Sequence, residues 1–183
     1  MMLGFRIALV VLIQSLFLIY MIYDRIQILE HGKVITLKTE PVDPRSLFRG
    51  DYVSLTYNIS HLDLNQLEGD NNFEKWQHIY VAVEKRGEDW APTGVYASWP
   101  QIIGDQVVIE GTVTDAFDHA VWADYGINSY FVPEGKGKGI EQAINIQADT
   151  TPVRVQLAVS DKGEAAIKGL ILNGKMLYQE TIF

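Results

Sequence analysis

Hydrophobic residues are arranged differently in the first 23 positions and in the rest of the chain. Residues 7–23, IALVVLIQSLFLIYMIY, contain no charge and are interrupted only by Gln14 and Ser15. This run is close to the lower limit of about 17 residues for a membrane span, and the preceding residues lengthen it if Arg6 extends its charge toward the membrane surface. Tyr20 and Tyr23 lie where an interfacial aromatic belt is expected. The pattern predicts a transmembrane anchor over residues 1–23.

Two alternatives to an uncleaved anchor are a cleaved signal peptide and a buried core helix. A signal peptide needs small residues at its cleavage site, and the sequence MIYDRIQILE at the end of the run offers none. We therefore favour an uncleaved anchor, followed by a helical extension or short linker over residues 24–32 that ends at Gly32. Positive charges before and after the apolar run are almost balanced, so they do not determine the orientation. We favour an N-terminus inside the cytoplasm with the remaining chain outside.

Apolar and polar residues alternate through most of residues 33–183. The runs KVITLKT, DYVSLTYNI, PVRVQLAVS and AAIKGLIL are rich in β-branched and aromatic residues, as is typical of strands. Turn sequences at residues 161–163 and 173–174 separate alternating runs and predict hairpins. Only residues 139–147, GIEQAINIQ, have a helical pattern. The sequence predicts a mostly β fold: an N-terminal transmembrane helix followed by a barrel-like antiparallel β domain with one short helix.

Composition narrows the range of partners. The chain carries 15 Lys and Arg against 23 Asp and Glu, a formal net charge of -8, which argues against nucleic acid and against electrostatic adhesion to anionic lipid. Cysteine is absent, so disulfides, thiolate metal sites and a thiol nucleophile are excluded. We expect no cofactor and no metal.

The segment PVDPRSLFRGDYVSLTYNIS, residues 41–60, has two interpretations. Its prolines restrict φ and favour extended geometry before them, and Gly50 permits positive φ, so a turn leads into a core strand with apolar residues at 53, 55, 57 and 59. Asp43, Arg45, Arg49 and Asp51 lie close together in the sequence and can form bidentate ion pairs. The segment is either a locked corner or a surface for a ligand or partner.

The residues GDYVSLTY, 50–57, resemble the motif of the GDYXXLXY protein family of bacterial membrane-anchored proteins. The preceding PVDPRSLFR and the later YGINSYFVPEGKGKGIE, residues 125–141, are similar to other recurring segments of that family. The resemblance implies a single-span protein of a family without an assigned activity, whose members often accompany multi-pass membrane proteins. The candidate binding residues of the two segments are Asp43, Arg45, Arg49, Gly50, Asp51, Tyr52, Leu55, Tyr57, Glu134 and Glu141.

The same segment is similar in layout to the start of the signal peptidase barrel. Pro44 and the Gly50–Asp51 pair match that family's Pro and Gly-Asp, but the position of its nucleophilic serine falls on Pro41. Proline has no hydroxyl, so acyl transfer from that position is excluded. Ser46 lies on the wrong side of Pro44, and a candidate base, Lys85, is typical of a solvated strand end. The comparison supports a barrel-like domain and weakens the interpretation as an enzyme.

Other candidate sites have simpler explanations. An acidic segment, TDAFDHAVWAD, contains Asp115, Asp118, His119 and Asp124 without the spacing of a known metal loop, and an inter-strand loop explains it. His61 and Asp63 are adjacent on a predicted loop. The sequence GKGKG, residues 135–139, lacks the Walker spacing. Trp90 and Trp99 flank a segment that a peptide or sugar groove could use.

Two functional hypotheses follow. The first is a membrane-anchored, non-enzymatic accessory or binding module that docks on a partner membrane protein. Its partners are the lipid bilayer, through residues 7–23, and a multi-pass membrane protein; it sits in the bacterial inner membrane with its C-terminal domain outside the cytoplasm. The alternative is a cell-envelope hydrolase that uses the carboxylates Asp51 and Glu134. The first hypothesis explains the anchor and the missing nucleophile.

Overall fold

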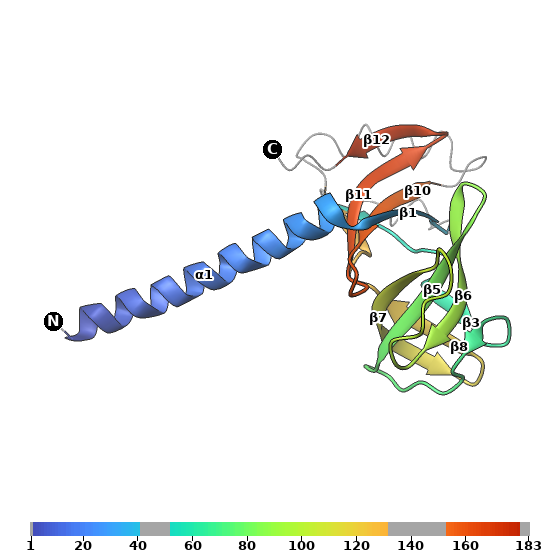
Figure 1. Cartoon of the computed structure of the whole chain (residues 1–183), viewed down its shortest axis with the longest axis horizontal. Helices are drawn as coiled ribbons and strands as arrows, with labels where there is room; N and C mark the ends of the chain where they lie inside the picture. The colour runs from blue at the N-terminus through green and yellow to red at the C-terminus, as the bar shows by residue number, and fades with distance from the viewer. Residues whose placement is uncertain (1, 41–51, 132–152, 180–183) are drawn as a thin grey trace.

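The computed structural model describes residues 2–40, 52–131 and 153–179, and begins with one long helix, α1 (Met2–His31), shown in Figure 1. Within Arg6–His31 the most apolar window has a mean hydropathy of 2.1, and none of it is buried against the rest of the structure. The alternative of a buried core helix is therefore wrong. By length and composition α1 is able to cross a membrane, a test that a signal sequence also passes. Residues 24–31 continue the helix.

The strands form three sheets. A four-stranded antiparallel sheet has the order β1-β10-β11-β12, a six-stranded sheet the order β3-β8-β7-β5-β6-β4, and β2 pairs with β9. The six-stranded sheet curls into a half barrel beneath the four-stranded one (Figure 1). Among the described strands, only the short β4 pairs in parallel, with β6. The bounds are β1 (Lys33–Lys38), β2 (Tyr52–Ser54), β3 (His61–Asp63), β4 (Glu68–Gly69), β5 (His78–Arg86), β6 (Asp89–Tyr96), β7 (Val107–Phe117), β8 (Ala120–Asp124), β9 (Ser129–Phe131), β10 (Arg154–Val159), β11 (Ala165–Leu172) and β12 (Lys175–Gln179).

These sheets confirm the predicted mostly β, barrel-like fold. Both predicted hairpins are present: β10 and β11 are joined through residues 161–163, and β11 and β12 through Asn173 and Gly174. Asn173 and Gly174 have φ values of 51° and 73°, the positive φ pair that a tight two-residue hairpin turn requires. The predicted short helix at residues 139–147 lies outside the described residues.

One hydrophobic core lies between the two large sheets. Alternation along β1 buries Ile35 and Leu37, and the central strand β5 contributes Val81 and Val83 from the opposite sheet. Each of these four side chains is at most 1% exposed. Burial of such side chains stabilises the fold by roughly 1.5–3 kcal/mol each. The core therefore holds both sheets together as one β unit, although the division of the chain at residue 33 stays a prediction.

The end of α1 is fixed to the four-stranded sheet. Ile28 is 6% exposed and packs against Ala158 of β10 and Ala166 of β11. The Arg25 guanidinium donates from Nη1 to the Ala165 carbonyl at 2.9 Å, and Lys168 Nζ donates to a helix carbonyl, that of Leu29, at 3.3 Å. Helix and sheet are thus joined by packing and by hydrogen bonds in both directions.

Candidate functional site

The structure brings together the two segments that the sequence singled out. Strand β2 belongs to the GDYVSLTY segment and β9 to the YGINSYFV segment, and they pair antiparallel with Tyr52 opposite Phe131 and Ser54 opposite Ser129. The pairing continues beyond the strands, because the Leu55 N–H donates to the Asn128 carbonyl at 2.8 Å. Two stretches distant in sequence therefore form one structural unit.

Two tyrosines link these segments reciprocally. Tyr57 donates its hydroxyl to the Ile127 carbonyl at 2.6 Å, and Tyr125 donates its hydroxyl to the Ile59 carbonyl at 2.7 Å. Tyr57 is 0% exposed and Tyr125 is 6% exposed, and burial raises the pKa of both phenols above the ordinary value. Each segment thus satisfies a buried carbonyl of the other with a neutral hydroxyl that stays protonated at physiological pH.

The last two named positions of the motif, Leu55 and Tyr57, are core residues. Leu55 is 5% exposed, and both side chains belong to the main hydrophobic cluster. The predicted burial of alternate residues in this strand is confirmed at Leu55, Tyr57 and Ile59. These side chains support the sheet junction, and a partner that contacts the motif has to do so through other residues.

Most of the predicted binding residues lie outside the described residues, so their role stays a prediction. Tyr52 is described as part of β2. The other predicted residues, for which the structure describes no position, are Asp43, Arg45, Arg49, Gly50, Asp51, Glu134 and Glu141. The hydrolase hypothesis, which depends on Asp51 and Glu134, therefore also stays a prediction.

The residues that flank the undescribed segments are bonded to each other in pairs. Thr39, just before residues 41–51, donates from N and Oγ1 to the carbonyl of Val153, just after residues 132–152, at 3.0 and 2.8 Å. The other two flanks are Tyr52 and Phe131, which are paired in the β2–β9 ladder. The flanks of the two segments are thus paired, the start of each with the end of the other.

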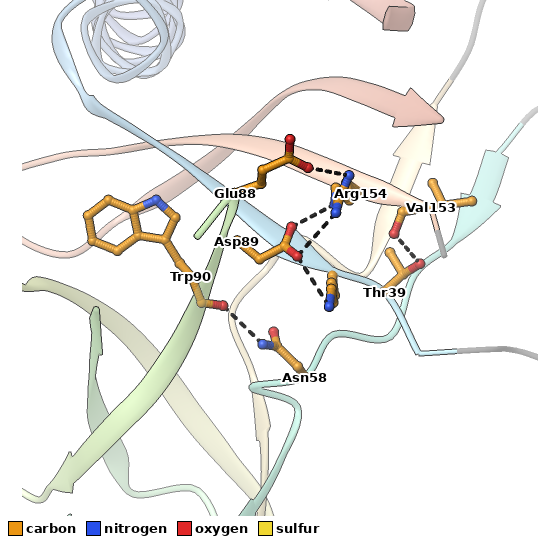
Figure 2. Close-up of polar contacts among 8 residues, drawn as sticks. Thr39, Asn58, Glu88, Asp89, Trp90, Val153 and Arg154 are labelled. Carbon is orange, nitrogen blue, oxygen red and sulfur yellow. Dashed lines mark hydrogen bonds and ion pairs between the residues drawn. The ribbon is translucent and has the colours of Figure 1, made fainter. Parts of the chain in front are cut away.

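A polar cluster lies next to this region and connects the two large sheets (Figure 2). Arg154 at the start of β10 places Nε 2.7 Å from Asp89 Oδ1 and Nη1 3.1 Å from Glu88 Oε2, and both carboxylates belong to the β5–β6 hairpin. Lys38 Nζ at the end of β1 lies 3.2 Å from Asp89 Oδ2. The Asn58 side chain donates to the Trp90 carbonyl at 3.0 Å beside them.

The exposure of these groups separates their roles. The Asp89 side chain is 14% exposed and that of Arg154 is 23% exposed, whereas that of Glu88 is 81% exposed. Two cations face two carboxylates, so the cluster is formally neutral and each carboxylate lies beside a cation. This arrangement joins β1 and β10 of the four-stranded sheet to the β5–β6 hairpin of the six-stranded sheet. The sequence did not predict this cluster. The one residue that pointed to it was Arg154, because it is a charged residue next to an apolar strand sequence.

Two of the weaker candidate sites, the acidic segment and the Trp90–Trp99 pair, are not assembled by the part of the fold that the structure describes, and GKGKG lies outside the described residues. Over the ranges that the structure describes, no three His, Asp or Glu side chains are grouped so that they could hold a metal ion. Trp90 is 6% exposed and Trp99 is 43% exposed, so only one of the two predicted groove residues is at the surface. Trp99 packs edge-to-face on Tyr80 at 5.6 Å between ring centroids.

His61 and Asp63 line an open, polar cavity of about 590 Å³ between β3 and the β5–β6 hairpin. Asp63 accepts from the Asn65 backbone N–H at 3.0 Å and from the Gln66 side chain at 2.7 Å. The Asn65 N–H and then the side-chain amides hold the pKa of Asp63 below its ordinary value, although partial burial opposes them. The carboxylate is therefore ionised and satisfied by the turn after β3. The prediction that His61 and Asp63 lie on a loop is wrong, because they form β3 and pair with β8. The His61 ring stacks on Trp122 at 4.3 Å between centroids.

The sequence model of the GDYXXLXY protein family matches residues 14–170 of the chain. The match includes part of α1, both paired segments and the strands that form the polar cluster. No curated protein and no solved structure matches the chain.

Proposed function

The chain belongs to the GDYXXLXY protein family, and on this premise we propose that it is a membrane-anchored, non-enzymatic accessory module. Residues 7–23 of α1 span the bacterial inner membrane, with the C-terminal domain outside the cytoplasm. The β domain docks on a partner membrane protein.

The observation that carries this proposal is the joint between α1 and the β domain. An apolar helix with none of its most hydrophobic window buried continues directly into a segment that packs on β10 and β11. Gly32 follows the helix so closely that a Cβ there would lie 2.5 Å from the Ile28 carbonyl oxygen and 3.0 Å from the Val159 backbone. A domain that only needed tethering would tolerate a flexible linker, whereas this joint presents one fixed face beside the membrane.

The motif residues support a non-enzymatic role. Leu55 and Tyr57 stabilise the core, and the carboxylates of the polar cluster are neutralised by Arg154 and Lys38. Enzyme sites commonly keep titratable groups with shifted pKa values in a cleft. The tyrosines with raised pKa, Tyr57 and Tyr125, are instead buried and bonded to backbone carbonyls. Asp63, whose pKa is lowered, does line an open cavity, but its carboxylate accepts hydrogen bonds from the adjacent turn.

The test is co-purification from detergent-solubilised membranes with the full chain tagged at its C-terminus. We expect a multi-pass membrane protein to co-purify with the full chain and with a variant whose residues 7–23 are replaced by an unrelated apolar span. A matched control carries α1 fused to an unrelated soluble domain and should not retain that partner. Retention by α1 alone, or no specific partner with the full chain, would contradict docking through the β domain.

Anchoring and orientation have separate tests. Amino-terminal sequencing of the membrane fraction should find Met1 or Met2, and a mature start after residue 23 would show a cleaved signal peptide. Trypsin added to spheroplasts should degrade the β domain. Protection that is lost only on lysis would reverse the proposed orientation.

A further inference from the structure

Trp76 is held rigidly in an exposed position. Its side chain is 72% exposed, and its φ of 71° is unusual for a bulky residue. The backbone is nevertheless fixed to β7, because the Trp76 N–H donates to the Val113 carbonyl at 2.8 Å and the Val113 N–H donates to the Gln77 carbonyl at 2.9 Å. A costly backbone conformation thus presents an indole ring to the surroundings, which is a feature typical of functional positions.

The position of Trp76 is defined relative to α1. Trp76 and Arg25 line the same open cavity of about 550 Å³, and Arg25 comes shortly after the apolar run 7–23. The bond from Arg25 to the Ala165 carbonyl, at 2.9 Å, fixes this part of the helix to β11. The β domain lies at the C-terminal end of α1 (Figure 1). Measured along the axis of α1, the indole is therefore close to the C-terminal end of the apolar run 7–23.

The surroundings of Trp76 suit the head groups of a bilayer better than a protein surface. Trp76 is the one exposed large apolar side chain among the residues that line this cavity, whereas a stable protein interface buries about 800 Å² per partner. The lining also carries the Arg25 cation and the carboxylates of Glu110, Asp124 and Glu164. The His78 ring Nδ1 lies 2.8 Å from Glu110 Oε1. Lys75 Nζ lies 5.5 Å from the centroid of the indole and can reach a phosphate beside it.

We propose that Trp76 inserts into the head-group region of the bilayer that holds α1, so that the β domain contacts the membrane at a second point. Tryptophan is favoured there because its ring is apolar while its N–H remains hydrated. Because carboxylates outnumber cations in this lining and the chain is acidic, we expect zwitterionic rather than anionic phospholipid at this contact. The inference rests on the proposed insertion of α1.

The test is fluorescence quenching of the full chain reconstituted into zwitterionic phosphatidylcholine vesicles whose acyl chains are brominated near the head group. The chain has four tryptophans and none is in α1, so helix insertion alone gives no direct signal. We expect quenching of the wild-type emission and loss of most of it in Trp76→Phe. The matched control is Trp122→Phe, at a 37% exposed tryptophan of β8, which should leave the quenching unchanged.

Two further measurements separate the possible failures. Flotation and carbonate resistance of the vesicles report insertion of α1; a protein that does not stay with the vesicles contradicts the proposed function itself. A protein that inserts while wild type and Trp76→Phe are quenched equally overturns only the contact by Trp76. The variant Lys75→Cys keeps the indole of Trp76 and carries a single thiol for labelling, because the chain has no cysteine of its own. A spin label there should gain oxygen accessibility on reconstitution relative to a label at Asp118→Cys, and equal values would also overturn the inference.

Discussion

Asp89→Asn should destabilise the fold far more than Glu88→Gln, although both carboxylates contact the same arginine. Removing one partner from a fully buried ion pair costs about 3–5 kcal/mol, because the remaining charge is left desolvated. Asp89 and Arg154 retain 14% and 23% exposure, so water partly solvates the charge that remains, and we expect about 2–3 kcal/mol. Glu88 is 81% exposed, and exposed pairs contribute at most about 1 kcal/mol.

Geometry adds to the difference between the two carboxylates. Asp89 forms ion pairs with two cations, at 2.7 Å from Oδ1 to Arg154 Nε and 3.2 Å from Oδ2 to Lys38 Nζ. Glu88 forms one, at 3.1 Å from Oε2 to Arg154 Nη1. The amide in Asp89→Asn keeps the size of the side chain but removes the charge that both cations share. The substitution therefore tests electrostatics with little change in packing.

The assay is urea unfolding of the full chain in detergent micelles, followed by tryptophan emission. All four tryptophans lie outside α1, so the signal reports on the β domain. With a slope of about 2 kcal/mol per M urea, Asp89→Asn should lower the midpoint by roughly 1–1.5 M and Glu88→Gln by about 0.5 M or less. Equal shifts for the two variants would refute the argument from burial. A shift for Asp89→Asn below about 1 M would show that water solvates the Arg154 charge in the variant.

The remaining predictions use the same assay. Tyr57→Phe should cost about 1–3 kcal/mol because it leaves a buried carbonyl without its donor, while Tyr80→Phe should change stability by no more than about 0.5 kcal/mol; equal effects would contradict the role of the buried hydroxyl. Gly32→Ala should cost about 1–3 kcal/mol by steric overlap, in contrast to Gly4→Ala, where a Cβ meets nothing within 4 Å; no loss at Gly32 would show that the joint yields. The pKa of Asp63 is lowered in the fold, so its stabilisation is present above the ordinary carboxyl pKa of about 3.9 and is lost as pH falls through the lowered value. Asp63→Asn should therefore make the urea midpoint less sensitive to acid, and an unchanged acid profile would count against this.

Local patterns were sufficient to predict much of the fold. Alternation predicted that Leu55, Tyr57 and Ile59 enter the core, and turn residues predicted both C-terminal hairpins, because period and turn chemistry act over a few positions. The partners of the tyrosines were not predictable in this way. Tyr57 and Ile127, which share a hydrogen bond, are separated by 70 positions. No local rule predicts which carbonyl accepts a hydrogen bond from a side chain that far away in the sequence.

The polar cluster shows the same limit for charged residues. Asp89 follows a Gly87–Glu88 turn signal and looks like an ordinary solvated turn residue in the sequence. Its burial depends on β10 returning beside the β5–β6 hairpin, which places Arg154 and Lys38 against it. Sheet order, and not strand pattern, decides which charges meet, and sheet order depends on pairings between distant segments.

The direct connection of α1 to the four-stranded sheet couples the orientation of the β domain to that of the helix. Because no flexible segment separates them, the angle of α1 about its own axis sets the direction in which every face of the domain points. One residue inserted into α1 would turn the domain by about 100° and displace it by about 1.5 Å. An insertion of seven residues would restore the original direction to within about 20°. The number of residues in α1 thus determines how the domain is rotated about the helix axis.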